Sequence, residues 1–229
     1  MFSPSSFKPH LAILPAAQRA LWPELRSTPE AFTLYGGTAI ALHLGHRESV
    51  DFDFFSAVPF DPQHLLSSIE YLHDAEVYQI QPGSLGCRLI RKEAPVQLSF
   101  FAPNDFSRLD PPHIASDTGL QIASLRDLAV SKLTVIQQRA ERKDYLDLHA
   151  LIYQAKISLS DMLVDAHLAY GHRFAPLASM QALSFFDEGD VAALSEGQKG
   201  DLTRAVNGVN LDAVEARIDA LTDRRDQDL

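Results

Sequence analysis

Residues 50–55, VDFDFF, alternate between apolar and acidic side chains up to a final pair of aromatics, and this pattern predicts a short β-strand. Successive side chains of a strand point to opposite faces. Asp51 and Asp53 therefore share one face, and the residues on either side of them share the other. The second face is apolar enough to require burial against a core. The strand thus presents two carboxylates together on its opposite face.

The rest of the first half contains further strand-like and helix-like segments. Pro15 and the pair Asp61-Pro62 are typical of helix starts. Residues 102–112 are rich in proline and predict a loop or a linker. The predicted helices cover residues 15–26, 38–44 and 61–72, and the predicted strands cover residues 31–35, 50–55, 76–80, 87–91 and 96–101.

The second half has helical patterns throughout. Ser124 and Asp127 form a capping-box pattern that opens a helix to about residue 138. A second helix is predicted over residues 142–153. Further helices follow, and Asn210 is a suitable N-cap for the last of them.

Because strands come first and helices later, the sequence indicates an α+β protein. We expect a small mixed β-sheet core with flanking helices over residues 1–115, followed by a C-terminal helical bundle over residues 116–229. The chain has 229 residues, of which 46% are hydrophobic. This is enough for one sizeable domain or for two small domains that share an interface.

The charge of the chain restricts how it could bind nucleic acid. Its formal net charge is −10, whereas proteins that bind nucleic acid through their whole surface are usually basic. Any RNA substrate must therefore be bound by a local patch. Cys87 is the only cysteine, which excludes an internal disulfide and fits a reducing cytoplasm. We find no signal-peptide pattern and no apolar run of the ~20 residues that span a bilayer, so we expect a cytoplasmic protein without membrane contact.

Gly36, Gly37 and Thr38 precede a helical segment upstream of the acidic strand. Glycines let the backbone approach a ligand closely, and a helix N-terminus suits phosphate. We assign these three residues to triphosphate binding and assign Asp51 and Asp53 to a divalent metal, Mg²⁺ or Mn²⁺. Such an ion bridges triphosphate oxygens in metal-dependent nucleotidyl transfer. The alternative is a plain glycine turn beside a solvated edge strand.

Two segments of the chain carry a family resemblance. Residues 33–55 contain Gly-Gly-Thr, then Gly45-His46-Arg47 and Ser49, then Asp-Phe-Asp. This order resembles the active-site signature of the polymerase β-type nucleotidyltransferase superfamily, and more narrowly the AbiEii/AbiGii-type toxins of abortive-infection systems. Residues 124–152 resemble later motifs of the same branch, a lysine-bearing helix followed by Arg-x-x-Arg-Lys-Asp-x-x-Asp-Leu. The resemblance implies a nucleotidyltransferase core whose helical domain contributes these motifs to the cleft.

The resemblance also implies roles for charged residues. Lys132, in an otherwise apolar helix, would stabilise triphosphate charge and act in catalysis with the two aspartates; the alternative is a lysine that extends to solvent. Asp144 and Asp147 share a helix face and would orient Lys132, Arg142 or the nucleotide. Alternatively, they only favour the helix dipole. Arg47 either contacts phosphate or neutralises the nearby aspartates.

The chain departs from the family pattern at one strand. The family normally carries a third carboxylate there, which helps hold a second metal and activates the attacking hydroxyl. The alternation of Gln97, Ser99 and Phe101 places Ser99 at that position. Serine is a poor metal ligand and a weak base. Three explanations remain open: Asp74 or Asp105 substitutes, the acceptor brings its own base, or catalysis is lost.

The resemblance implies an NTP-dependent enzyme that leaves a nucleoside monophosphate on an acceptor and releases pyrophosphate. By resemblance, the acceptor would be an RNA end such as that of tRNA. The protein would be the toxin of an abortive-infection or toxin–antitoxin type system, with a cognate antitoxin as a candidate partner. The alternatives are nucleotidylation of a protein side chain and a non-catalytic nucleotide-binding protein. The sequence contains no Walker phosphate loop, dinucleotide fingerprint or serine nucleophile elbow, which removes the commonest competing enzyme classes.

Overall fold

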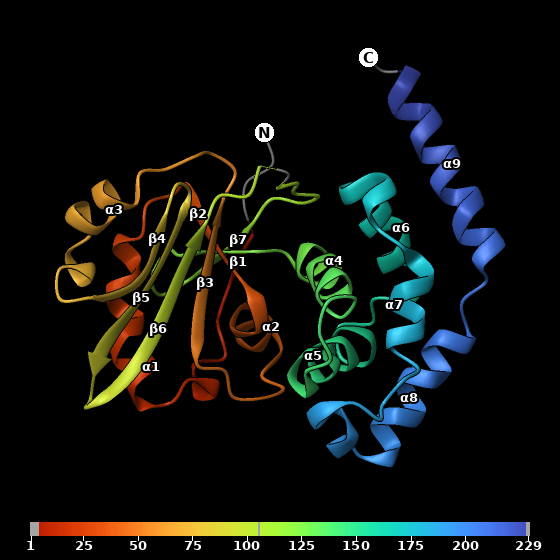
Figure 1. Cartoon of the computed structure of the whole chain (residues 1–229), viewed down its shortest axis with the longest axis horizontal. Coiled ribbons are helices and arrows are strands. Elements are labelled where there is room, and N and C mark those ends of the chain that lie inside the picture. Colours follow the sequence, from red (N-terminus) through yellow and green to blue (C-terminus); the bar gives the residue numbers. More distant parts are fainter. Residues whose placement is uncertain (1–4, 105, 228–229) are drawn as a thin grey trace. The chain divides into compact units, whose positions relative to one another are not determined.

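The computed structural model describes residues 5–104 and 106–227. The chain divides into two compact units, Met1–Ser124 and Leu125–Leu229. The first unit contains a mixed sheet with helices, and the described part of the second contains helices only (Figure 1). This confirms the predicted α+β class. The boundary falls after residue 124 instead of after residue 115.

The boundary differs because two short strands follow the predicted linker. These are β7 (His113–Ala115) and β8 (Gln121–Ile122). β8 pairs in parallel with β2 (Phe32–Tyr35), and β7 pairs with β8. Strands of two or three residues are too short to show an alternating pattern. The linker therefore returns the chain to the sheet of the first unit.

The sheet of the first unit has the strand order β1-β7-β8-β2-β3-β6-β5-β4. The two neighbours of β3 in this sheet, β2 and β6, were predicted as strands, whereas β1, β7 and β8 were not. The further elements of this unit are β1 (Ser6–Phe7), η1 (Leu11–Ile13), α1 (Ala16–Leu21), η2 (Trp22–Ser27), α2 (Gly36–Leu44), β3 (Asp51–Ser56), α3 (Pro62–Ser68), η3 (Glu70–Leu72), β4 (Glu76–Gln81), β5 (Ser84–Arg91) and β6 (Ala94–Phe101).

The first predicted helix is interrupted. We expected one helix over residues 15–26, but the α-helix ends at Leu21 and the chain continues as the 3₁₀ segment η2. Pro23 explains this difference, because proline has no N–H and its ring clashes with the preceding turn. The predicted start of α3 is confirmed, since the Asp61 side chain accepts a hydrogen bond from the backbone N–H of Gln63.

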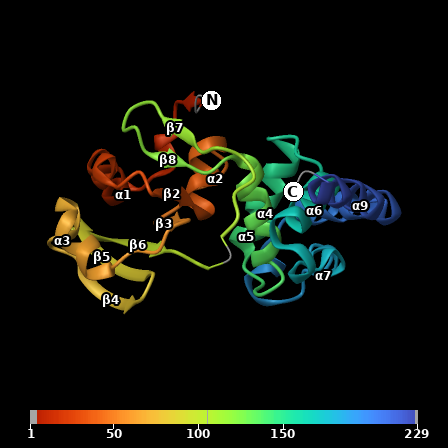
Figure 2. The ribbon, with the colours of Figure 1, turned by 90° about the horizontal axis from the view of Figure 1, so that it is seen from above.

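β3 has the two faces that its sequence predicts. Phe52 and Phe54 are fully buried, as are Leu98 and Phe100 on the parallel neighbour β6. The rings of Phe54 and Phe100 stack with centroids 5.0 Å apart. Burial of such a side chain stabilises the fold by about 1.5–3 kcal/mol. In Figure 2, α1 and α3 lie on the same side of the sheet, and α1 contacts β5 and β6.

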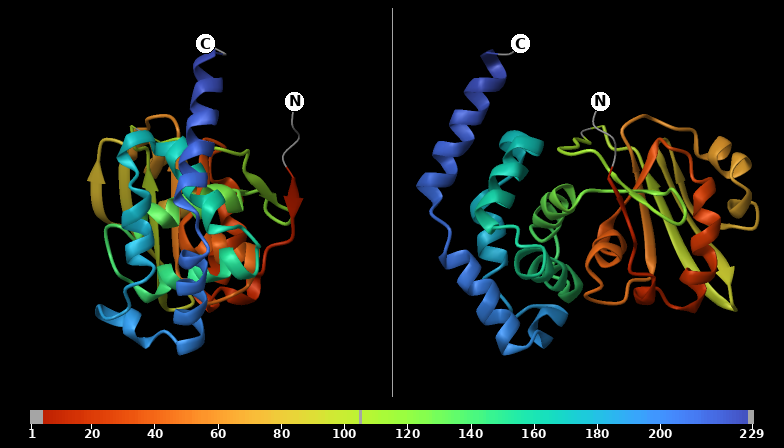
Figure 3. Two further views of the ribbon diagram at one scale, coloured as in Figure 1. Left: turned by 90° about the vertical axis from the view of Figure 1, so that its right-hand side faces the viewer. Right: turned by 180° about the vertical axis from the view of Figure 1, so that it is seen from behind.

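The second unit is built from helices α4 (Leu125–Val135), α5 (Arg142–Tyr153), α6 (Leu159–Tyr170), α7 (Pro176–Ala182), α8 (Glu196–Asn207) and α9 (Leu211–Gln227), with the 3₁₀ segments η4 (Gly171–Arg173) and η5 (Gly189–Ala193) (Figure 3). α4 packs on α5 and α6, α5 packs on α8, and α6 packs on α9. The Asn210 side chain accepts from the N–H of Ala213 (3.1 Å), which confirms the predicted cap. Within the described ranges, no helix is both long and apolar enough to cross a bilayer.

His43, near the end of α2, lies in a cluster of aromatic rings in the first unit. It stacks on Phe7 with centroids 4.2 Å apart and meets His113 edge-on at 5.2 Å. One ring nitrogen, Nε2, lies 3.0 Å from the carbonyl oxygen of Ala123. Desolvation by burial, with smaller contributions from His113 and His10, lowers the pKa of His43 to about 4. The native state therefore holds this imidazole neutral.

We predict that His43 makes the first unit less stable in acid. Its pKa is lower in the folded state than in the unfolded chain, so the unfolded chain binds the proton first as the pH falls. Stability should be lost between about pH 6.5 and pH 4, by up to about 1.4 kcal/mol per pH unit. Urea unfolding at several pH values measures this slope. His43→Gln should flatten it, whereas His64→Gln, at an exposed site on α3, should not. Equal slopes for wild type and His43→Gln would contradict the prediction.

Candidate active site

The turn between β2 and α2 brings the backbone against a carboxylate. Gly36 begins α2 with a φ of +72°, a conformation that side-chain-bearing residues rarely adopt. A β-carbon at position 36 would lie only 2.7 Å from Oδ2 of Asp53. Glycine is therefore required here both for its backbone angle and for the space it leaves. The close approach at Gly36 places the N-terminus of the nine-residue helix α2 directly beside the Asp53 carboxylate.

Asp51 and Asp53 lie together on one face of β3, as predicted, and both side chains are partly exposed. Mg²⁺ prefers one or two carboxylates completed by phosphate oxygens and water. The two carboxylates fit that requirement for a single ion. In the described part of the chain, no group of three or more His, Cys, Asp or Glu side chains could hold a metal. The fit is thus to one divalent ion that shares its coordination with a phosphate ligand.

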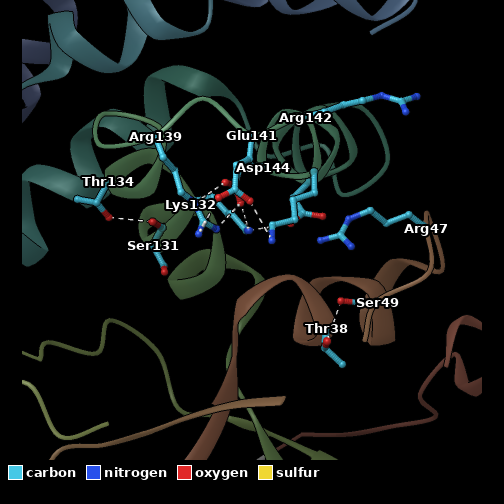
Figure 4. Close-up of polar contacts among 12 residues, drawn as sticks. Thr38, Arg47, Ser49, Ser131, Lys132, Thr134, Arg139, Glu141, Arg142 and Asp144 are labelled. Atoms are coloured by element: carbon cyan, nitrogen blue, oxygen red, sulfur yellow. Dashed lines mark hydrogen bonds and ion pairs between the residues drawn. The ribbon is translucent and has the colours of Figure 1, made fainter. Parts of the chain in front are cut away.

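Thr38 connects the start of α2 to the start of β3 (Figure 4). It is 2% exposed, and its hydroxyl forms hydrogen bonds with Ser49 Oγ (2.7 Å) and with the carbonyl oxygen of Asp51. We expected this hydroxyl to contact the triphosphate directly. Its burial and its partners instead make Thr38 a positioning residue that fixes Asp51 relative to the glycine turn.

Ser99 lies next to Asp53, as the alternation of β6 predicts, because the two residues are partners in the parallel register of β3 and β6. Asp74 does not replace the missing carboxylate. Its side chain pairs with that of Arg91 on β5 (3.1 Å). Arg91 is five residues from Gly86, the partner of Ser99, so the alternation of side chains places Arg91 on the opposite face of the sheet. The other candidate, Asp105, lies outside the described residues.

Arg47 follows the glycine that ends α2. One of its guanidinium nitrogens, Nη1, donates to the carbonyl oxygen of Glu48 (2.8 Å), so that the side chain folds back onto its own loop. Both roles expected for Arg47, a phosphate contact and neutralisation of the aspartates, stay predictions.

Lys132 is buried in the second unit between two carboxylates. Its Nζ lies 2.5 Å from Asp144 Oδ1 and 2.8 Å from Asp147 Oδ2 (Figure 4). Lys132 is 6% exposed and both aspartates are 0% exposed. The structure therefore excludes a lysine that extends freely to solvent. The aspartates do more than favour the helix dipole, because they orient the Lys132 ammonium.

Arg139 completes this cluster, and sequence reasoning gave it no role. Its Nε donates to Asp144 Oδ2 (2.9 Å), and its Nη1 also pairs with the partly exposed Glu141 (3.2 Å). Arg139 is the first arginine of the Arg-x-x-Arg segment, and its place in that motif is the feature of the sequence that could have indicated its role. The backbone N–H of Arg142 donates to Asp190 Oδ1 (2.7 Å), and the expected role of its guanidinium beside the acids stays a prediction.

Comparisons with known proteins identify the family of the chain. The family model described as nucleotidyl transferase AbiEii toxin, type IV toxin–antitoxin system, matches residues 23–224. This range contains both the glycine–aspartate segment and the lysine–aspartate helices. The predicted family resemblance is confirmed.

A curated relative and a solved structure illustrate what the chain is similar to. An uncharacterised protein of Aquifex aeolicus (strain VF5) is 36% identical over 124 residues, which cover 53% of this chain and 57% of that protein. The chain thus spans little more than half the length of that relative. MenT4, a nucleotidyltransferase toxin from Mycobacterium tuberculosis H37Rv, is similar with a TM-score of 0.50 and 14% identity over 84% of this chain and 82% of that chain. At this identity, the likeness shows the fold alone.

We predict that Gly36→Ala damages both stability and the carboxylate site. The left-handed backbone should cost about 1–3 kcal/mol, and the new methyl group should displace the Asp53 carboxylate. Magnesium-dependent NTP binding should then be lost. Gly119→Ala is a matched control, because Gly119 has a similar φ of +76° but nothing within 4 Å of its β-carbon position. It should lose stability and keep NTP binding. Thermal unfolding with and without Mg²⁺-NTP separates the two effects.

A second prediction concerns the charge balance at Lys132. Lys132→Ala leaves two buried carboxylates facing one arginine, and loss of one partner from a buried pair costs about 3–5 kcal/mol. The double variant Lys132→Met/Asp147→Asn removes one charge of each sign and should recover most of that loss. Lys199→Met, which breaks a pair with the exposed Glu196, should cost less than about 1 kcal/mol. Urea unfolding measures all three, and a loss for Lys132→Ala no larger than that for Lys199→Met would contradict the prediction.

Proposed function

Because the chain belongs to the AbiEii nucleotidyl transferase toxin family, we propose that it transfers a nucleoside monophosphate from an NTP to an acceptor hydroxyl and acts as a toxin. One observation carries this proposal: Gly36 places the N-terminus of α2 directly beside the Asp53 carboxylate, and both residues are partly exposed. A phosphate-binding helix terminus and a metal-binding carboxylate pair are the two parts that nucleotidyl transfer requires at adjacent positions.

In this proposal, backbone N–H groups at Gly36 and Gly37 bind the β- and γ-phosphates of the NTP, aided by the positive end of the α2 dipole. Asp51 and Asp53 would hold Mg²⁺ or Mn²⁺, which when bound neutralises triphosphate charge and polarises the α-phosphate. Thr38 and Ser49 keep Asp51 in place through their hydrogen bonds. The oxygen of the acceptor hydroxyl forms a bond to the α-phosphorus while the bond from that phosphorus to the oxygen bridging to the β-phosphate breaks. Pyrophosphate leaves with the bridging oxygen, and the hydroxyl proton passes to solvent water.

We also propose that Lys132 contributes to triphosphate binding. An ammonium has three N–H donors, and Asp144 and Asp147 account for two of them. The third is available for a phosphate oxygen. The balanced variant Lys132→Met/Asp147→Asn isolates this contribution, because it should fold while it weakens NTP binding more than monophosphate binding.

Ser99 limits the rate in this proposal. With no carboxylate at its position on β6, the proton of the attacking hydroxyl has no base there. General-base catalysis typically contributes 10²–10⁴-fold, so we expect slow transfer with intact NTP binding. The same observation supports a second candidate function, a nucleotide-binding protein that does not catalyse transfer.

The acceptor and the partner are also proposals. The family is one of type IV toxin–antitoxin systems, and a cognate antitoxin is therefore the protein partner that we propose. We propose an RNA end as the acceptor. A net charge of −10 requires that such an RNA be bound locally, beside the carboxylates, and not over the whole surface.

We predict that Mg²⁺-NTP raises the melting temperature of the wild-type protein. A ligand at 100 times its Kd stabilises the native state by about 2.7 kcal/mol, which for a chain of this size is a shift of about 5–10 °C. Asp51→Asn and Asp53→Asn should each abolish the magnesium-dependent part of the shift. Asp187→Asn, at an exposed site in the second unit, controls for the loss of one negative charge. A magnesium-dependent shift that survives in Asp51→Asn/Asp53→Asn would overturn the metal assignment.

Transfer itself is tested with NTP labelled at the α-phosphate, offered to total RNA and to a protein extract. Label in RNA supports the proposed reaction, and label in protein supports nucleotidylation of a side chain. A protein that shows the thermal shift but transfers label to neither acceptor is the non-catalytic binding protein of the second candidate.

A further inference from the structure

Beyond Ser99, the carboxylate face of the sheet continues over residues that have almost no side chain. Ser99 on β6 is the partner of Gly86 on the antiparallel strand β5. Gly86 is in turn the partner of Gln79 on the edge strand β4. From Asp53, the face therefore passes over a serine and a glycine. Adjacent strands are about 4.8 Å apart, so these two small residues span about 10 Å of sheet.

Tyr78 on β4 forms the far end of this span. Its ring carbons Cε2 and Cζ lie 2.5 and 3.0 Å from the place where a β-carbon of residue 86 would be. The ring therefore lies over Gly86, on the same face as Ser99 and Asp53. It is nevertheless 54% exposed. An aromatic ring in this position offers a π-surface to a ligand that occupies the space above Ser99.

The direction of nucleotidyl transfer determines which ligand would occupy that space. In phosphoryl transfer, the attacking and leaving oxygens lie roughly in line on opposite sides of the phosphorus. β3 has β2 on one side and β6 on the other. The glycine turn that would bind the leaving pyrophosphate follows β2 directly. The attacking hydroxyl must therefore approach from the β6 side, above Ser99.

We propose that Ser99, Gly86 and Tyr78 form the acceptor subsite, in which the terminal base of a single-stranded RNA end stacks on the Tyr78 ring. This inference rests on the proposed nucleotidyl transfer. Each nucleic-acid base has a π-face, and stacking on an exposed aromatic ring binds single strands without sequence preference. The ribose that carries the attacking hydroxyl would then lie over Ser99, between the Tyr78 ring and Asp53.

The charged residues on this part of the face are few. Arg88, two residues along β5 from Gly86 and so on the same face, pairs with Glu76 of β4 (2.6 Å). Its side chain is 44% exposed. It provides a guanidinium for an RNA phosphate within a chain that is acidic as a whole. The subsite is thus of the local kind that the net charge requires.

A purely structural role for Tyr78 predicts different behaviour. An aromatic ring that covers a strand glycine stabilises a sheet by itself. That role needs only apolar cover, which leucine also supplies. Stacking of a base needs the aromatic ring. Tyr78→Leu therefore separates the two roles, and Tyr78→Phe tests whether the hydroxyl contributes.

The test is fluorescence anisotropy of the full-length protein with a short labelled single-stranded RNA that has a free 3′ end, measured without NTP. Tyr78→Ala and Tyr78→Leu should weaken RNA binding about 5- to 100-fold, the range expected for one stacked base, and Tyr78→Phe should bind as wild type. Gly86→Ala should cause a similar loss, because its methyl group displaces the ring. Val77→Ala is the matched control, since Val77 pairs with the buried Cys87 on the opposite face of β4.

Two readouts keep this inference separate from the proposed function. All the Tyr78 variants should keep the magnesium-dependent NTP shift, because they do not touch the glycine turn or the aspartates. If wild type shows no NTP shift, the proposed function fails, whatever the RNA result. If the shift is present but Tyr78→Leu binds RNA as tightly as wild type, the ring only covers Gly86 and the stacking subsite is wrong. Absence of RNA binding by wild type, or label transfer to protein alone, also overturns the RNA subsite.

Discussion

The alternation of side chains along β3 is the constraint on which the candidate site depends. One face of this strand buries Phe52 and Phe54 against β6 and the helices, and the other face presents Asp51 and Asp53. A shift by one residue would expose both phenylalanines and bury both carboxylates, at a cost of several kcal/mol. The hydrophobic core therefore determines the direction of the carboxylates. Gly36 packs against Asp53, and the Thr38 hydroxyl donates a hydrogen bond to the carbonyl oxygen of Asp51, so the glycine turn takes its position from the same strand.

The parts of the structure that were predictable are those with a strong local pattern. Helix α5 has the predicted bounds, and β3 begins one residue after its predicted start. The strands β1, β7 and β8 were missed because two or three residues show no periodicity. Ser99 was placed beside Asp53 by alternation alone, but its pairing with Gly86 depends on the strand order, which local patterns do not contain. The position of the Tyr78 ring over Gly86 could not be predicted from the sequence for the same reason.

The lysine cluster shows a different limit of sequence reasoning. The helical period places Lys132 among apolar residues, which is compatible either with exposure or with burial. The packing of α5 against α4 determines that Lys132 is buried, because it brings Asp144 and Asp147 to the ammonium. The half-exposed Arg139 adds a second cation at Asp144 and also pairs with Glu141. Such a cluster holds Lys132 in one orientation at a desolvation cost that a stability role alone would not favour. This makes the cluster better suited to positioning a charged group than to strengthening the fold.

Charge balance also gives the serine on β6 a physical meaning. Two carboxylates match one divalent cation, whereas a third would leave an excess negative charge unless a second cation were bound. In an acidic chain, that excess would repel the phosphates of both the NTP and an incoming RNA end. Ser99, the partner of Asp53, and Gly86, the partner of Ser99 on β5, add no charge to this face, over which the proposed acceptor would approach. In the proposed reaction, a serine at this position thus removes a base and also lowers the repulsion of the acceptor, and the rate of transfer would depend on the balance between these two effects.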